Sequence, residues 1–196
     1  MQLQGKVIGF CLTGSHCNME KAFPALQALL EEGAQLLPIL STNAANTDTR
    51  YGKASDLIEK LRAMTGRTPL MTIAEVEPVG PKKLADCVVV LPCTGNTLAK
   101  LANAITDTPV TMACKAHLRN GRPVVLAITT NDGLGLNARN LGVLLAARNI
   151  FFVPFGQDNP HSKPTSIDAR VDLVVPTVLA ALEGRQYQPL LVTYPG

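Results

Sequence analysis

The sequence lacks the features that mark membrane-spanning, secreted and nucleic-acid-binding proteins. Its apolar runs, such as 87–92 and 123–128, are far shorter than the roughly 20 residues that a membrane-spanning helix requires. Residues 1–6 do not begin a secretory signal, because no long apolar region and no small-residue cleavage site follow them. Basic residues are scattered, with no run longer than Lys82-Lys83. We therefore expect a cytoplasmic protein that binds neither membranes nor nucleic acids.

Cysteine and histidine residues are too few and too dispersed to indicate a metal site or a disulfide framework. The five cysteines are odd in number and form no C-x-x-C pair. The three histidines, His16, His117 and His161, form no H-x-x-x-H motif. We expect no bound metal ion.

Aromatic residues are also scarce, at 4% with no tryptophan, although 46% of the residues are hydrophobic. A hydrophobic core must therefore consist of valine, leucine, isoleucine and alanine side chains. The length of 196 residues is typical of one domain. We expect a single domain over residues 1–196, with a core at 1–182 and a tail at 183–196 that shows no clear periodicity.

Short apolar runs alternate with segments of helical periodicity along the chain. For example, Met19, Ala22, Phe23, Leu26 and Leu29 recur at spacings of three and four, which predicts a helix that ends near a glycine. Strands are expected at 6–11, 35–40, 86–91, 122–128 and 150–153, with a short edge strand at 68–72. Helices are expected at 53–65, 96–104, 110–118, 137–148 and 168–182, and irregular segments at 41–51, 75–81 and 155–161. This alternation predicts an α/β protein, a three-layer Rossmann-like fold with a doubly wound, mostly parallel sheet.

In such sheets a ligand lies beyond the carboxyl ends of the strands, which here are the loops after Cys11, Leu40, Leu91 and Ile128. The first of these loops contains Thr13-Gly14-Ser15 and leads into a helix. Backbone N–H groups at a helix start favour an anion, and hydroxyl groups add donors to a phosphate. The loop matches neither Walker A nor G-x-G-x-x-G. The alternative interpretation is a helix N-cap that Ser15 or Asn18 forms.

The loop at 91–100 joins a buried strand to a helix through proline, glycine and small polar residues. Thr94, Asn96 and Thr97 offer donors and acceptors that suit a flat heteroaromatic ring. The alternative is an ordinary strand–helix turn with Asn96 as its cap. Cys93 stands among apolar residues, which is typical of a packing thiol rather than of a nucleophile.

Two further loops carry polar side chains at the same edge of the sheet. The loop at 41–50 combines short hydrogen-bonding groups with Arg50, which is suited to pair with a substrate carboxylate, although a solvated turn fits as well. Asn131 and Asp132 follow the strand at 122–128 and are expected to project into the crevice, while Asp132-Gly133 also fits a simple turn.

Among the histidines, His16 stands out because it lies in the first ligand loop and its side chain ordinarily titrates near neutral pH. His117 lies between Lys115 and Arg119 on an expected helix. That setting predicts a surface position for His117.

Taken together, the loops resemble the FMN-binding flavoprotein superfamily. That superfamily includes homo-oligomeric cysteine decarboxylases, phosphopantothenoylcysteine decarboxylases and flavin prenyltransferases. Within it the chain is similar to the family of the B subunit of dipicolinate synthase, over nearly its whole length. The segments that carry the similarity are 9–17, 49–52, 73–83, 92–100, 105–113, 116–123 and 152–158.

The resemblance implies FMN at the crevice. The residues expected to hold its phosphate are Thr13, Gly14 and Ser15, with Ser41 from the second strand end. The residues expected near its isoalloxazine ring are Pro92, Cys93, Thr94, Asn96 and Thr97.

The resemblance also implies a reaction and partners. The A subunit of dipicolinate synthase is a separate NAD(P)-binding chain, and the pair oxidises a dihydrodipicolinate-type intermediate to dipicolinate in the mother cell during spore formation. In the decarboxylases an asparagine that matches Asn131 contacts the substrate. From their places in the ligand loops, His16 and Arg50 are candidate catalytic residues and Lys53 a candidate binder of the small dicarboxylate substrate. A homo-oligomer, a trimer or larger, is expected as well.

Two alternatives remain open at this point. The first is an FMN-dependent decarboxylase or flavin prenyltransferase. Against it, residues 41–81 contain no histidine where the decarboxylases have a catalytic one, and their Pro-Ala-Met-Asn motif reads Ile-Thr-Thr-Asn at 128–131. The second is a non-catalytic scaffold that stabilises the NAD(P)-binding partner, because a ligand loop indicates binding and not chemistry.

Overall fold

The computed structural model describes residues 1–193 except for the side chain of His16, so the end of the expected tail, residues 194–196, lies outside it. A parallel sheet forms its centre, in the order β2-β1-β3-β4. Its strands are β1 (Val7–Leu12), β2 (Gln35–Leu40), β3 (Cys87–Cys93) and β4 (Val124–Thr130), and the short β5 (Ile150–Phe152) pairs with the first half of β4. Most of their side chains are buried, as in a sheet that is covered on both faces.

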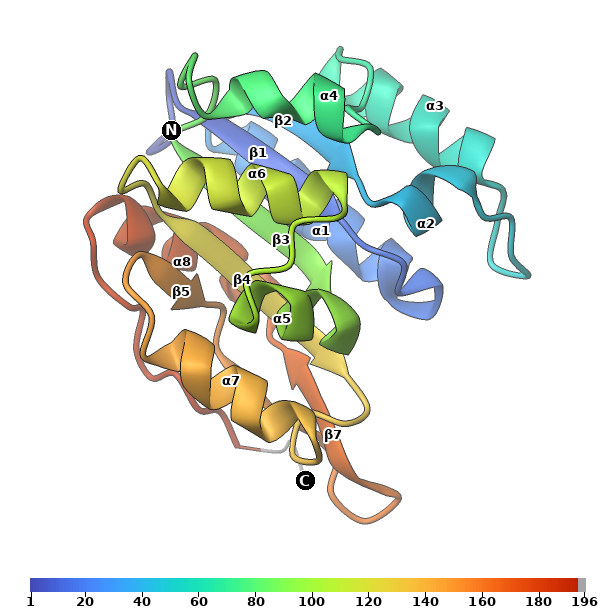
Figure 1. Ribbon diagram of the computed structural model, residues 1–196, viewed down its shortest axis with the longest axis vertical. Coiled ribbons are helices and arrows are strands. Elements are labelled where there is room, and N and C mark those ends of the chain that lie inside the picture. The colour runs from blue at the N-terminus through green and yellow to red at the C-terminus, as the bar shows by residue number, and fades with distance from the viewer. Residues whose placement is uncertain (194–196) are drawn as a thin grey trace.

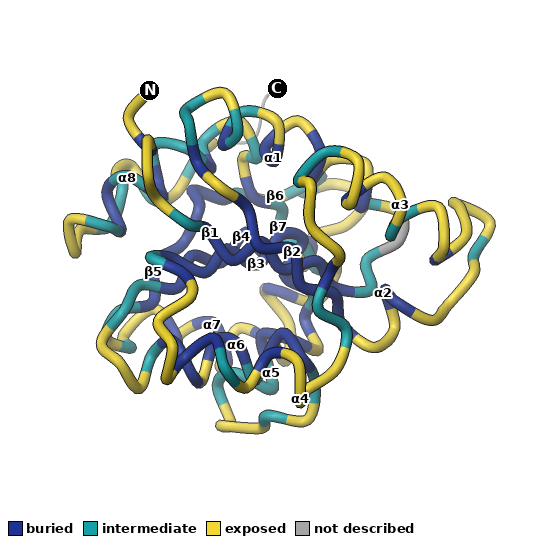
Figure 2. Tube along the Cα trace, turned by 90° about the horizontal axis from the view of Figure 1, so that it is seen from above, coloured by how far each residue is buried: buried dark blue, intermediate teal, exposed yellow. Residues whose placement is uncertain are grey.

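Helices cover both faces of this sheet (Figures 1 and 2). One face carries α1 (Ala22–Glu31) and α8 (Val174–Leu182), while α4 (Ile73–Val76), α5 (Gly95–Ala102), α6 (Pro109–Leu118) and α7 (Asn137–Leu145) cover the other. The longer α3 (Ala54–Thr65) packs beside β2. The predicted α/β fold with a mostly parallel sheet is thereby confirmed.

The edge of β4 is shared by two partners. Its first half pairs with β5, and its last residues, Thr129 and Thr130, pair antiparallel with β7 (Lys163–Ala169). A hairpin joins β7 to β6 (Phe155–Asn159). The prediction of an irregular segment at 155–161 is therefore wrong, since β6 occupies most of it. The prediction failed because β6 is a polar edge strand without the alternation of apolar residues that indicates a strand.

The expected helix at 168–182 is also shorter than predicted. Residues 168 and 169 end β7, a 3-10 turn η3 (Val171–Leu173) follows, and α8 begins only at Val174. Pro176 is the third residue of α8 and therefore lies in its first turn, where a helix does not need the missing N–H group.

Three short segments also differ from prediction. The loop at 41–51 contains α2 (Thr42–Asn46), and 75–81 contains the end of α4 and the 3-10 turn η2 (Glu77–Val79). Side-chain caps explain α2 and α4, because Ser41 accepts from the Ala44 N–H and Thr72 from the Glu75 N–H. The expected edge strand at 68–72 is reduced to one bridge, from Ile39 to Leu70.

Across residues 1–193, no helix combines the length and the apolar character that crossing a membrane requires.

His117 is buried rather than on the surface, with 1% of its area exposed. It points inward from α6, and its Nε2 lies 3.3 Å from the carbonyl oxygen of Asp86. Burial lowers the pKa of His117 to about 4, since the charged ring loses its hydration. The neighbouring Lys115 and Arg119 were misleading because residues two apart on a helix face different directions.

We expect the burial of His117 to make the fold sensitive to mild acid. Its pKa is lower in the folded than in the unfolded state, so the unfolded state binds more protons below about pH 6.5 and stability falls as the pH falls from there toward 4. Between pH 7 and pH 5 this contributes a loss of about 2 kcal/mol. Urea unfolding of His117→Gln at the two pH values is expected to show a loss smaller by that amount. Parallel losses in the variant and the unaltered chain would contradict this account.

Candidate functional site

The carboxyl ends of β1, β2, β3 and β4 meet at one edge of the sheet, and the switch in strand order lies between β1 and β3. Thr13, which follows β1, joins the two loops at this point. Its buried hydroxyl group donates to the carbonyl oxygen of Pro92 at 2.6 Å and accepts from the Thr94 N–H at 3.3 Å. The loops after β1 and β3 are therefore held together as one unit.

Thr94 is the residue that caps α5, not Asn96 as the turn interpretation suggested. The Oγ1 of Thr94 accepts from the Thr97 N–H at 3.2 Å and lies 3.0 Å from the Thr97 hydroxyl. Asn96 is exposed at the start of the helix, while Pro92 and Cys93 are buried in the last residues of β3. Burial raises the pKa of the Cys93 thiol, which therefore stays protonated at neutral pH, as expected of a packing thiol.

Two serine hydroxyl groups lie at the ends of neighbouring strands. Ser41 follows β2, and its N–H donates to the carbonyl oxygen of Leu12 in β1 at 2.9 Å. The Ser41 Oγ accepts from the Ala44 N–H, and the Ser15 Oγ accepts from the Asn18 side-chain amide at 3.1 Å. Within the part of the chain that the structure describes, neither hydroxyl donates, so each retains a proton for a ligand.

The first loop leads into a 3-10 turn, η1 (His16–Lys21), rather than directly into a regular helix. Ser15 stands at its N-cap position, but its side chain makes no capping hydrogen bond. The side chain of His16, the candidate catalytic residue, lies outside the described part of the structure. Its role stays a prediction.

Arg50 and Lys53 lie on the exposed segment between α2 and α3. The guanidinium of Arg50 donates to the Tyr51 hydroxyl at 2.7 Å, and this hydrogen bond raises the pKa of Arg50 above its usual value. In residues 1–193, no hydrogen bond joins Arg50 or Lys53 to the Thr13 and Thr94 contacts.

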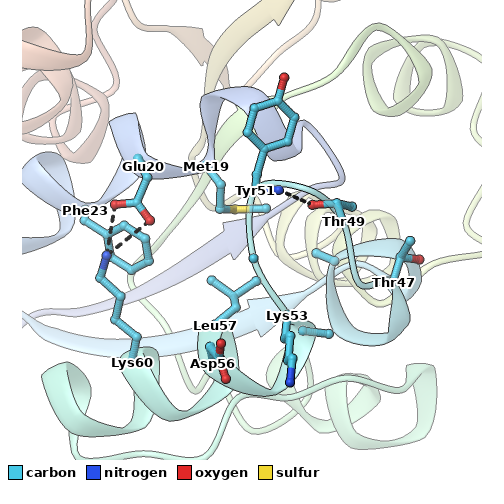
Figure 3. Close-up of a pocket in the computed structure, with 13 residues that line it drawn as sticks. Met19, Glu20, Phe23, Thr47, Thr49, Tyr51, Lys53, Asp56, Leu57 and Lys60 are labelled. Carbon is cyan, nitrogen blue, oxygen red and sulfur yellow. Dashed lines mark hydrogen bonds and ion pairs between the residues drawn. The ribbon is translucent and has the colours of Figure 1, made fainter.

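Lys53 lines a cavity of about 210 Å³ that lies between η1, α1, α2 and α3 (Figure 3). Its apolar lining includes Phe23, and the amine of Lys60 lies 3.4 Å from the centre of that ring and 3.0 Å from a carboxylate oxygen of Glu20. Asp56 is a second carboxylate in the lining. Two cations and two carboxylates leave this cavity without net charge, so it does not by itself favour a dicarboxylate.

Asn131 is exposed after β4, and β7 holds it in place. Its carbonyl oxygen accepts from the Thr165 hydroxyl at 2.7 Å, and its side-chain oxygen accepts from the Ser166 hydroxyl at 3.2 Å. Sequence reasoning missed Thr165 and Ser166 because it assigned no strand there. The polar turn at 160–162, followed by β-branched Thr165 and Ile167 two residues apart, is the signal that predicts the hairpin.

The structure thus brings together only part of the predicted site. The residues joined directly or through neighbouring backbone are Thr13, Ser41, Pro92, Thr94 and Thr97. Arg50 and Lys53 stand apart on their own segment. In the region described, His, Cys, Asp and Glu side chains form no group of three or more that could hold a metal ion.

Comparison with known proteins extends over most of the chain. Residues 1–178 match the family model described as Flavoprotein. The chain is 50% identical over 190 residues to the B subunit of dipicolinate synthase of Bacillus subtilis (strain 168), covering 97% of this chain and 95% of that protein.

Two solved structures extend the comparison. The crystal structure of the dipicolinate synthase B subunit from Bacillus halodurans C superposes with a TM-score of 0.91 at 47% identity, covering 98% of this chain and 99% of that one. DmrB of Burkholderia xenovorans, solved in complex with FMN, superposes with a TM-score of 0.51 at 27% identity, covering 63% of this chain and 65% of that one.

The family model spans well over half of the chain, and the Bacillus subtilis protein matches it almost from end to end. The chain therefore belongs to the flavoprotein family, whose members bind FMN, and within it to the family of the dipicolinate synthase B subunit.

Proposed function

We propose that this chain acts with the NAD(P)-dependent A subunit of dipicolinate synthase to oxidise a dihydrodipicolinate-type intermediate to dipicolinate during sporulation, in the cytoplasm of the mother cell. The observation that carries the proposal is the 50% identity to the B subunit of a dipicolinate synthase over 97% of the chain. The joined loops at the switch point support it, since they hold small polar side chains and backbone N–H groups at the carboxyl edge of the sheet.

The donor set at this edge fits FMN. Ser15 and Ser41 each retain a hydroxyl proton, and they follow neighbouring strands, which suits a phosphate held between two loops. In the described residues every buried side-chain nitrogen or oxygen has a hydrogen-bond partner, so the phosphate contacts are assigned to the hydroxyl protons of Ser15 and Ser41 and not to an unpaired buried group. We propose that Thr13 and Gly14 complete the phosphate site through the loop backbone.

The ring site is proposed at the start of α5. Pro92 and Cys93 give it a buried apolar wall, while the exposed Asn96 amide and the Thr94 and Thr97 hydroxyl pair offer polar contacts. When bound there, FMN supplies an acceptor for the hydride equivalent that a dihydropyridine ring loses on becoming aromatic.

The remaining candidate residues are assigned to the substrate. Arg50 and Lys53 each carry a positive charge on an exposed segment, and we propose that they bind the two carboxylates. Asn131 is proposed to contact the substrate through its side-chain amide, whose oxygen Ser166 already holds. His16 is proposed to accept the proton that the substrate ring loses, at an imidazole nitrogen.

A homo-oligomer of three or more copies is part of the proposal. Members of the family form homo-oligomers, as the dodecameric decarboxylase from Escherichia coli O157:H7 illustrates. The low aromatic content gives no indication of the surface that copies of this chain would share.

The proposed phosphate site leads to a prediction about FMN binding. The purified chain is expected to bind FMN and to quench its fluorescence, and Ser15→Ala and Ser41→Ala are each expected to weaken binding about tenfold or more, because each loses a hydroxyl donor to a charged group. Fluorescence titration measures the dissociation constants.

The control for Ser41→Ala is Thr108→Ala. Thr108 caps α6 as Ser41 caps α2, so both variants lose about 1 kcal/mol of helix capping, but Thr108 lies outside the proposed site. Equal FMN affinity in the Ser41 and Thr108 variants would rule out a contact from Ser41.

The proposed substrate contacts lead to a prediction about turnover by the reconstituted pair of subunits. Arg50→Ala is expected to raise the KM for the dihydropyridine substrate about tenfold, and His16→Ala to lower kcat by about 10² or more. Arg62→Ala, which removes an exposed arginine paired with Glu59 on α3, serves as the control and is expected to leave both constants unchanged.

Pyridine-dicarboxylate formation, followed by absorbance, measures both constants. Unchanged values in both variants would remove Arg50 and His16 from the site. A colourless chain that still restores the activity of its partner would support a scaffold instead.

A further inference from the structure

The carboxylate of Asp132 is held by two neutral donors just beyond β4. The Thr130 hydroxyl donates to Oδ1 at 2.5 Å, and the Asn137 side-chain amide donates to Oδ2 at 2.8 Å. Among the described residues Asp132 forms no ion pair. Asp132 is exposed and stands in a turn, as its sequence allowed, in which the Gly135 N–H donates to its carbonyl oxygen at 2.9 Å. The two side-chain donors orient both of its carboxylate oxygens.

A chain of side-chain amides continues from Asp132 toward the far end of α5. The buried Asn140 donates to the Asn137 oxygen at 2.8 Å, and its own oxygen accepts from the Asn103 amide at 3.4 Å. Asn103 is the residue that ends α5, and its amide also donates to the carbonyl oxygen of Ala99 at 2.7 Å. The network thus extends from the end of β4, along α7, to the last turn of α5.

The first residue of α5 packs directly on the same network. A Cβ atom added to Gly95 would lie 2.6 Å from the Thr130 hydroxyl, 2.7 Å from the Asn137 amide nitrogen and 2.8 Å from the Asp132 carboxylate. A methyl group at Gly95 would therefore require these three side chains, or the start of α5, to shift.

Both ends of α5 therefore contact one network, and α5 carries the polar groups of the proposed ring site in its first turn. We propose that Asp132 is a positioning residue that sets the place of the first turn of α5, and with it the geometry of Thr94, Asn96 and Thr97. This inference rests on the proposed function, because it concerns the same FMN site. Asp132 acts through Thr130, Asn137 and Gly95 and has no assigned contact with the ligand.

The test compares FMN affinity with the thermal stability of the ligand-free chain. Asp132→Ala is expected to weaken FMN binding about tenfold or more, since it removes the group that orients the first turn. Asp132→Asn is expected to retain most of the affinity, because its amide oxygen accepts from Asn137 and its nitrogen donates to Thr130. A merely structural role would instead lower Tm and leave the affinity of the folded chain unchanged.

Gly95→Ala reaches the same network without altering Asp132. Its methyl group would collide with the Thr130, Asn137 and Asp132 side chains and disturb the contact between the network and α5, so it too is expected to weaken FMN binding. The matched control is Asp107→Ala, which removes a carboxylate paired with Lys100 in the last turns of α5 and outside this network, and which is expected to bind FMN as the unaltered chain does.

Unchanged FMN affinity in both Asp132→Ala and Gly95→Ala would overturn the positioning role while leaving the proposed function in place. An equal loss in Asp132→Asn and Asp132→Ala would also overturn it, because charge and not geometry would then be responsible. If the unaltered chain binds no FMN, both proposals fall.

Discussion

The hydroxyl group of Thr13 links the ends of β1 and β3, the two strands between which the strand order of the sheet reverses. The position of the ligand loops that follow these strands depends on this link. A buried hydroxyl needs partners, because an unsatisfied one costs free energy. Thr13 meets this need by donating to Pro92 and accepting from Thr94. Since Thr94 also caps α5, one short side chain after β1 is bonded directly to the residue at which a helix that follows β3 begins.

The candidate site consists of a rigid part and an exposed part. The rigid part lies around α5, which Thr13 and Thr94 hold from one side and the Asp132 network from the other. The exposed part is the segment with Arg50 and Lys53, which meets solvent and borders the cavity beside η1 and α1. This division is compatible with the proposed function, in which FMN stays bound while a small charged substrate enters and leaves, because long cationic side chains on a loop adjust at little cost.

The sequence predicts the parallel core well and the last third of the chain less well. The apolar runs that form β1, β3 and β4 are buried on both faces of the sheet, so the hydrophobic pattern alone locates these strands. The β6–β7 hairpin depends on tertiary pairing with the end of β4 and on ion pairs such as Lys163 with Asp158, which leave no apolar period. The contacts of Thr13, Asp132 and Ser166 join segments distant in the chain, and no local pattern shows which polar groups will meet.

One edge of β4 pairs with β5 along its first half and with β7 at its end, so a change in the core and a change in the hairpin affect different parts of this strand. The parallel pairing with β5 belongs to the core, whereas the hairpin pairs with the end of β4 at Thr129 and Thr130 and is bonded to the loop after β4 through Thr165 and Ser166. The turn at 160–162 lies at the tip of that hairpin, beyond Asn131. Because this turn lies outside the parallel ladder of β1 to β5, its length can change while the core pairing stays intact, so the fold tolerates variation at the hairpin tip.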